Sequence, residues 1–157
     1  VMGSAAQQGR TGALNDAVAN DGWTLVTQQT AEWNAEKAQQ IVQSVIDSGE
    51  SFNVIYAEND DMAKGAVAAL DKANIPHGVG KDVIVMGFDC NKWALEELLN
   101  QNWNYDGQCN PFQASYIDDI IKKIEAGETI SEKTIIMDEK GFDASTISQA
   151  DVDQYGI

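Results

Sequence analysis

Apolar and polar positions along the chain alternate between short apolar runs and longer stretches with a period near 3.6 residues. The apolar runs predict strands over residues 23–26, 52–57, 83–88, 103–108 and 133–137, and Val1-Met2 reads as the tail of an earlier strand. The periodic stretches predict helices over residues 8–20, 35–48, 93–100 and 112–125, and one more that begins at residue 60. After residue 137 the chain is a polar, acidic tail. This alternation is typical of βαβ units with parallel strands.

The run from Val83 to Phe88 is the most apolar of the chain, and it predicts a central parallel strand buried on both faces. The 157 residues fit one domain of common size. We therefore predict an α/β fold with an open, mostly parallel sheet flanked by helices on both faces. Ligands of such sheets bind beyond the carboxyl ends of the strands, so residues at those ends are the candidate site.

Five residues at or just beyond successive strand ends share a chemistry. They are Arg10, Trp33, Asn59, Asp89 and Gln108. A guanidinium donates hydrogen bonds in a fork, a carboxylate accepts them, amides do both, and an indole covers C–H groups. Sugars present hydroxyls and apolar C–H faces, so the set predicts a sugar site without a catalytic pair.

The sequence gives less support to an enzymatic function. The only histidine, His77, lies in the loop over residues 74–80, away from the strand ends, where we expect it to be solvated. No serine or cysteine is therefore placed to pair with a histidine as in a hydrolase. We predict that the chain is not an enzyme and has no cofactor or metal.

Two other motif interpretations fit the sequence less well than a sugar site. The opening "GSAAQQGRTG" resembles a phosphate loop, but five residues separate its first two glycines and Arg10 replaces the lysine of a Walker loop. Asp60, Asp61 and Asp89 fit a phosphoacceptor receiver, which needs an aspartate after the third strand and a lysine after the fifth, around Mg²⁺. Asn59 and Gln108 stand at those positions, which argues against it.

The net charge of −15, from 25 acidic and 10 basic residues, argues against nucleic acid or an anionic membrane as a partner. The sequence contains no run of 18 apolar residues, so it predicts no membrane-spanning helix. The two cysteines, Cys90 and Cys109, lack zinc-ligand spacing. We expect two buried free thiols, and a disulfide between them stays open as the alternative.

Five segments also carry a resemblance to a known family. They are "GSAAQQGRTG", "QQTAEWNAEKAQQ", "VIYAENDDMAKGAVAAL", "VIVMGFDCNKWALEELLNQNW" and "YDGQCNPFQASY". With them, nearly the whole chain resembles the carboxyl-terminal half of type I periplasmic-type sugar-binding proteins, the ribose-, galactofuranose- and related sugar-binding components of ABC transporters.

The resemblance implies that Arg10, Trp33, Asn59, Asp89 and Gln108 contact the sugar, because each stands at a position that does so in the family. The chain departs from the family at three places. Trp33 replaces the commoner phenylalanine, Cys90 stands where glycine is usual, and Trp93 adds an indole near the same rim. These departures leave the identity of the sugar open.

The family has two lobes that close over the sugar, and the resemblance implies that this chain is a piece with one of them. Residues 1–108 form the carboxyl-terminal sugar-binding lobe, 109–132 a crossover helix segment, and 133–157 a returning strand and tail. The crossover helix normally packs on a missing amino-terminal lobe. In this chain we expect its inward face to repack on the same molecule or to form a homodimer. That face comprises Tyr116, Ile117, Ile120, Ile121 and Ile124.

The function implied by the resemblance is to bind a monosaccharide and deliver it to the membrane permease of an ABC transporter. The expected location is extracytoplasmic, either periplasmic or lipid-anchored on the outer face of the cytoplasmic membrane. The alternative is the effector-sensing domain of a sugar-responsive transcription repressor, which shares this fold. The sequence upstream of Val1 would distinguish the two.

Overall fold

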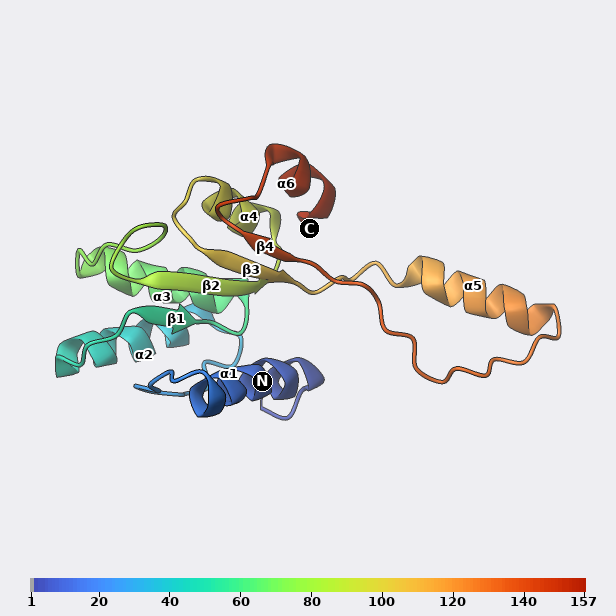
Figure 1. Cartoon of the computed structure of the whole chain (residues 1–157), viewed down its shortest axis with the longest axis horizontal. Helices are drawn as coiled ribbons and strands as arrows, with labels where there is room; N and C mark the ends of the chain where they lie inside the picture. Colours follow the sequence, from blue (N-terminus) through green and yellow to red (C-terminus); the bar gives the residue numbers. More distant parts are fainter. Residues whose placement is uncertain (1) are drawn as a thin grey trace.

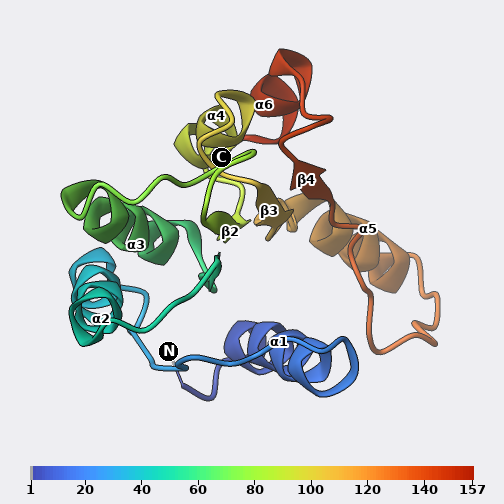
Figure 2. The same cartoon turned by 60° about the vertical axis from the view of Figure 1, so that its left-hand side comes forward.

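The computed structural model describes residues 2–157, so the prediction for Val1 lies outside the described residues. Six helices and four strands are assigned there (Figures 1 and 2). The helices are α1 (Ala5–Asn20), α2 (Ala35–Ser48), α3 (Asp60–Lys72), α4 (Lys92–Leu99), α5 (Ala114–Glu125) and α6 (Gln149–Tyr155). The strands are β1 (Val54–Tyr56), β2 (Ile84–Asp89), β3 (Tyr105–Gln108) and β4 (Gly141–Asp143).

The strands form one open sheet in the order β1-β2-β3-β4. β1, β2 and β3 are parallel, and β4 runs antiparallel to β3. Helices lie on both faces of the sheet. Since successive residues of a strand point to opposite faces, the neighbours of two successive residues identify the helix on each side. A side chain at Gly87 would meet Asp60 of α3, whereas the ring of the next residue, Phe88, lies against Arg10 of α1. The predicted α/β fold is confirmed.

Two predicted strands are absent. Residues 23–26 are irregular and Trp23 is 40% exposed, because no backbone ladder pairs with them among residues 2–157. Residues 133–137 are irregular as well, and the side chain of Ile136 is exposed. The chain returns to the edge of β3 only at Lys140, where the backbone N–H of Gln108 donates to the carbonyl of Lys140 at 2.8 Å. β4 begins there.

The acidic tail contains a helix, α6, that was not predicted. Ser148 caps it by accepting from the backbone N–H of Asp151, whose carboxylate accepts in turn from the Ser148 N–H, a reciprocal capping box. Val152 is its buried anchor. The Ser-x-x-Asp spacing was the available sequence signal.

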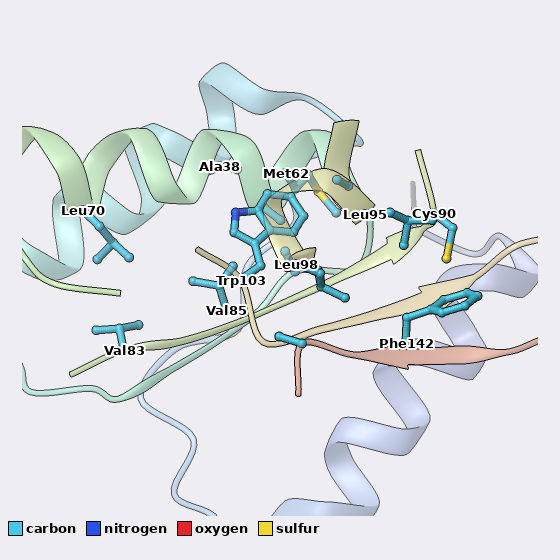
Figure 3. Packing of buried hydrophobic residues seen from close by; sticks show 14 of the residues in the cluster. Ala38, Met62, Leu70, Val83, Val85, Cys90, Leu95, Leu98, Trp103 and Phe142 are labelled. Carbon is cyan, nitrogen blue, oxygen red and sulfur yellow. The ribbon is translucent and has the colours of Figure 1, made fainter. Parts of the chain in front are cut away.

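The core lies between the sheet, α3 and α4 (Figure 3), and Val152 of α6 joins it. Trp103 is its largest fully buried side chain. β2 is central, as predicted, but it is fully covered on one face only: Val83 and Val85 are buried, whereas Ile84 between them is exposed. The predicted burial on both faces is wrong because α1 covers only the carboxyl end of β2, near Phe88.

α5 stands apart from the rest of the molecule on a long arm (Figure 1). Among the described residues α5 makes no extensive contact with another helix or strand, and Ile124 is 58% exposed. Its apolar face is pronounced, with Ile117 and Ile121 exposed beside Ile124. Repacking of this face on the same molecule, one of the two expected outcomes, is therefore not what the structure shows.

Two smaller expectations need correction. Cys90 is buried as expected, but Cys109 is exposed because it lies on the arm that leads to α5. Both thiols are free, so the two cysteines form no disulfide in the structure. His77 is not solvated, because its side chain is only 13% exposed: its Nε2 lies 3.0 Å from a carboxylate oxygen of Asp71 and its Nδ1 3.0 Å from the carbonyl of Asn102. These contacts fix the loop at the amino end of β2, far along the strand from Asp89.

Candidate functional site

Arg10 is the centre of the candidate site. It lies in the second turn of α1, which begins after Ser4 caps the backbone N–H of Gln7. Its Nη2 lies 3.1 Å from Oδ1 of Asp89, and its Nη1 donates to the carbonyl of Glu58. The Arg10 side chain is only 12% exposed and that of Asp89 28%, so the pair is partly desolvated. Removing one member of such an ion pair costs free energy, because the other charge then stays buried without a partner.

Asp89 ends β2 in an unusual backbone conformation. Its φ is 121° and that of Cys90 is 60°, both in the region that favours glycine. Burial raises the pKa of the Asp89 carboxyl, and the neighbouring Arg10 guanidinium offsets part of that rise. The turn aims the carboxylate at α1 rather than along the sheet.

Aromatic rings flank the guanidinium. The ring centroid of Phe88 lies 4.8 Å from Cζ of Arg10, and that of Trp33 lies 5.9 Å from it. Trp33 itself has a φ of 60°, in the turn that precedes the Asn34 cap of α2. A charged pair beside aromatic faces is suited to a ligand with both hydroxyls and C–H groups.

Asn59 and Gln108 have structural bonds as well as a place at the site. Asn59 is buried and caps α3, with its side-chain oxygen accepting from the N–H of Met62 at 2.9 Å. Gln108 is the register partner of Asp89, and its Oε1 accepts from the N–H of Lys140 at 3.2 Å. In both residues the side-chain NH₂ has no partner in the described structure, which leaves a donor for a ligand.

The structure thus brings the predicted residues to one end of the sheet. Asp89 and Trp33 both lie beside the Arg10 guanidinium. Asn59 follows directly on Glu58, whose carbonyl Arg10 contacts, and Gln108 lies next to Asp89 across the β2–β3 pair.

One residue of this site was missed from the sequence. Phe88 was assigned to a buried strand, yet its ring faces Arg10 and packs edge-on against Tyr56, with 5.5 Å between centroids. Gly107 makes room for it, since a Cβ there would lie 2.7 Å from Cδ1 of Phe88. Strand alternation was the available signal, because Phe88 lies on the opposite face from Val85 and Gly87.

Trp93, in contrast, is not at the rim where it was expected. It packs edge-on against Trp103, with 5.8 Å between centroids, and the ammonium of Lys64 lies over its ring. Trp103 faces Gly87, so Trp93 lies on the α3 side of the sheet, opposite Arg10. The reason is that α4 crosses over that face.

Two hollows lie near α1. A cavity of about 380 Å³ adjoins the site and is lined by Thr11, Trp33, Tyr56 and Glu58, among others. A larger groove of about 620 Å³ runs between residues 23–27, β1 and α2, beside the sheet rather than at its carboxyl end. Within residues 2–157 no three His, Cys, Asp or Glu side chains gather as metal ligands, and no helix is long and apolar enough to span a membrane.

The chain is similar to proteins of known family and fold. The family model described as "Periplasmic binding protein domain" matches residues 1–126. A fructose import binding protein of Bifidobacterium longum is 30% identical over 128 residues, which are 80% of this chain and 38% of that protein. A ribose import binding protein of Bacillus subtilis is 29% identical over 64% of this chain and 31% of its own length. The chain therefore spans only about a third of these two relatives.

Solved structures share the fold. The periplasmic binding protein of an arabinose ABC transporter from Shewanella, bound to arabinofuranose, has a TM-score of 0.87 and 22% identity, covering 99% of this chain and 51% of its own. A Mycobacterium smegmatis protein in complex with β-D-fucofuranose has a TM-score of 0.73 and 26% identity, covering 87% of this chain and 44% of its own. By the family match and this fold, the chain belongs to the periplasmic binding protein domain family.

Proposed function

We propose that this chain forms one wall of a monosaccharide-binding cleft and takes part in sugar import through an ABC transporter. The observation that carries the proposal is the partly desolvated Arg10–Asp89 pair beside the rings of Phe88 and Trp33. Asp89 accepts from sugar hydroxyls, Arg10 donates in a fork, and the rings cover the C–H face. Asn59 and Gln108 contribute their remaining amide donors.

The relatives support this choice of ligand. Two of them are import binding proteins for fructose and ribose, and two solved neighbours hold furanose sugars. In this proposal the sugar is bound and released without chemical change. The chain works outside the cytoplasmic membrane, hands its ligand to a membrane permease, and needs a second lobe to close the cleft.

Calorimetry tests the proposal on a two-lobe protein that contains this chain. Pentoses and hexoses that populate the furanose ring should give saturable binding to one site, whereas a disaccharide of the size of maltose should not fit. The chain alone should bind weakly or not at all, because one wall of the cleft is missing. If none of the monosaccharides binds to the two-lobe protein, the proposal is wrong.

We also expect the isolated chain to self-associate through α5, because its exposed isoleucines have no partner on the described chain. Light scattering should show a dimer, and Ile121→Lys should convert it to a monomer. Ser115→Lys makes the same change of charge on the polar face of α5 and should leave the dimer intact. A monomeric wild-type chain at all measurable concentrations would contradict this expectation.

A further inference from the structure

Two carboxyl groups lie buried beneath the turn that carries Asp89. Asp60 is the first residue of α3 and Asp106 lies in β3, and both residues are 0% exposed. Asp106 is the register partner of Gly87, and opposed residues of parallel strands point to the same face. Oδ1 of Asp60 lies only 2.7 Å from where a Cβ on Gly87 would stand. The two carboxyl groups therefore share one small space on the α3 side of the sheet.

The hydrogen bonds of this pair are incomplete if both groups are ionised. Oδ2 of Asp60 accepts from the backbone N–H of Asn91 at 2.8 Å and from its side-chain NH₂ at 3.0 Å. Oδ1 of Asp60 and both carboxyl oxygens of Asp106 make no well-formed hydrogen bond with a donor among the described residues, although the backbone N–H and the thiol of Cys90 lie near Asp106. Ionised carboxylates only accept, so two of them cannot bond each other. A single proton turns one of them into a donor and removes one buried charge.

The bonds from Asp60 to Asn91 have a mechanical consequence. Asp89 and Cys90 both have positive φ, and a backbone held in that region needs support from its surroundings. Asn91 is the next residue, and Asp60 fixes both its backbone and its side chain. Asp60 thereby fixes the end of the turn that aims Asp89 at Arg10.

We propose that Asp60 and Asp106 share one proton at neutral pH and that this proton-sharing pair positions Asp89 through Asn91. Asp60 and Asp106 are positioning residues, since nothing places them in contact with the sugar. The second half of the proposal rests on the proposed function of Asp89 as the sugar acceptor. The first half concerns the folded chain alone.

The electrostatic surroundings agree with a retained proton. Burial raises the pKa of Asp106 to about 9 and that of Asp60 to about 6. The titratable groups beside the pair are Asp89, whose charge opposes further ionisation, and the Cys90 thiol, and burial raises the pKa of both. Tyr105 precedes Asp106 in β3, so its phenol lies on the other face of the sheet. The nearby cation, Arg10, bonds to Asp89 instead.

The shared proton makes the stability of the folded chain depend on pH. Unfolded carboxyls lose their protons near pH 4, while the folded pair keeps one up to about pH 9. The folded state then binds one more proton, so stability is full below pH 4 and falls as pH rises through the window. Between pH 6 and 9 the ratio of folded to unfolded chain should fall about tenfold per pH unit on account of this pair.

Carboxyl ¹³C NMR titration of the chain tests the shared proton directly. We expect two buried aspartate signals that do not complete their titration by pH 7, with the last proton lost near pH 9. Urea denaturation across pH 6 to 8, below the pH at which an unfolded cysteine ionises, should show the falling ratio in wild type and a flat profile in Asp106→Asn, whose amide donates to Asp60 without a proton to lose. Asp61→Asn, the same change at the exposed neighbour, should keep the wild-type slope.

Positioning is tested by the pH profile of sugar affinity in the two-lobe protein. Wild type should lose affinity, by tenfold or more, as the pair ionises near pH 9, and Asp106→Asn should keep its affinity there. Complete ionisation of both signals near pH 4 overturns the shared proton, whatever the sugar result. An absence of any sugar binding overturns the proposed function instead, and leaves the NMR result standing.

Discussion

Asp89→Ala should weaken sugar binding to the two-lobe protein by about 3 kcal/mol, roughly a hundredfold. The substitution removes a hydroxyl acceptor and leaves the Arg10 guanidinium, only 12% exposed, without its carboxylate partner. Truncating one member of a desolvated ion pair costs more free energy than the intact pair contributes, because the remaining charge stays buried without a partner. Calorimetry against the best-binding sugar measures the loss.

Two further variants decide how the loss arises. Asp16→Ala removes an exposed carboxylate from the same helix as Arg10 and should leave affinity unchanged. Combined with Arg10→Ala, the Asp89 variant completes a double-mutant cycle, in which the two losses should be strongly non-additive. Additive losses would mean that the two residues act separately. Unchanged affinity in Asp89→Ala, with folding intact by circular dichroism, would remove Asp89 from the site.

The sequence was sufficient to predict the three parallel strands and the meeting of the candidate residues at one end of the sheet, because both depend on local patterns. β2 and the helices before and after it follow apolar periodicity, and the ends of parallel strands meet at one edge of a sheet. Arg10 and Asp89 could therefore be predicted to lie close together although 79 residues separate them. Arg10 itself lies within α1, as do Gly9 and Gly12, and of the glycines in that segment only Gly3 has a positive φ.

The errors have a common physical cause, since a strand requires a backbone partner that its own sequence does not specify. Residues 23–26 and 133–137 have strand-like composition and find no ladder among the described residues. β4 forms instead at Gly141–Asp143, where the chain meets the free edge of β3. The arm that holds α5 sets this point of return.

Local sequence patterns also could not predict which carboxylates are buried. Asp60 and Asp61 looked alike in the sequence, two carboxylates favoured at the start of a helix. In the structure Asp61 is exposed, while Asp60 is fully buried against Asn91. The difference arises from helical geometry, which turns Asp60 toward β2 and β3, and it depends on Gly87 having no side chain there.

Gly65→Ala should lower the free energy of unfolding by about 3 kcal/mol, at the upper end of the usual cost of overpacking. A Cβ at Gly65 would lie 2.0 Å from the carbonyl oxygen of Ala35 and 2.7 Å from its carbonyl carbon, both backbone atoms of α2. The first turn of α2 would have to move away from α3, and Trp33 lies just ahead of that turn, so the site is affected as well. Gly12→Ala, in α1 with nothing within 4 Å of its Cβ, should instead leave stability unchanged or raise it by up to about 1 kcal/mol. Urea denaturation measures both, and equal midpoints for wild type and Gly65→Ala would show that α2 and α3 do not pack this closely.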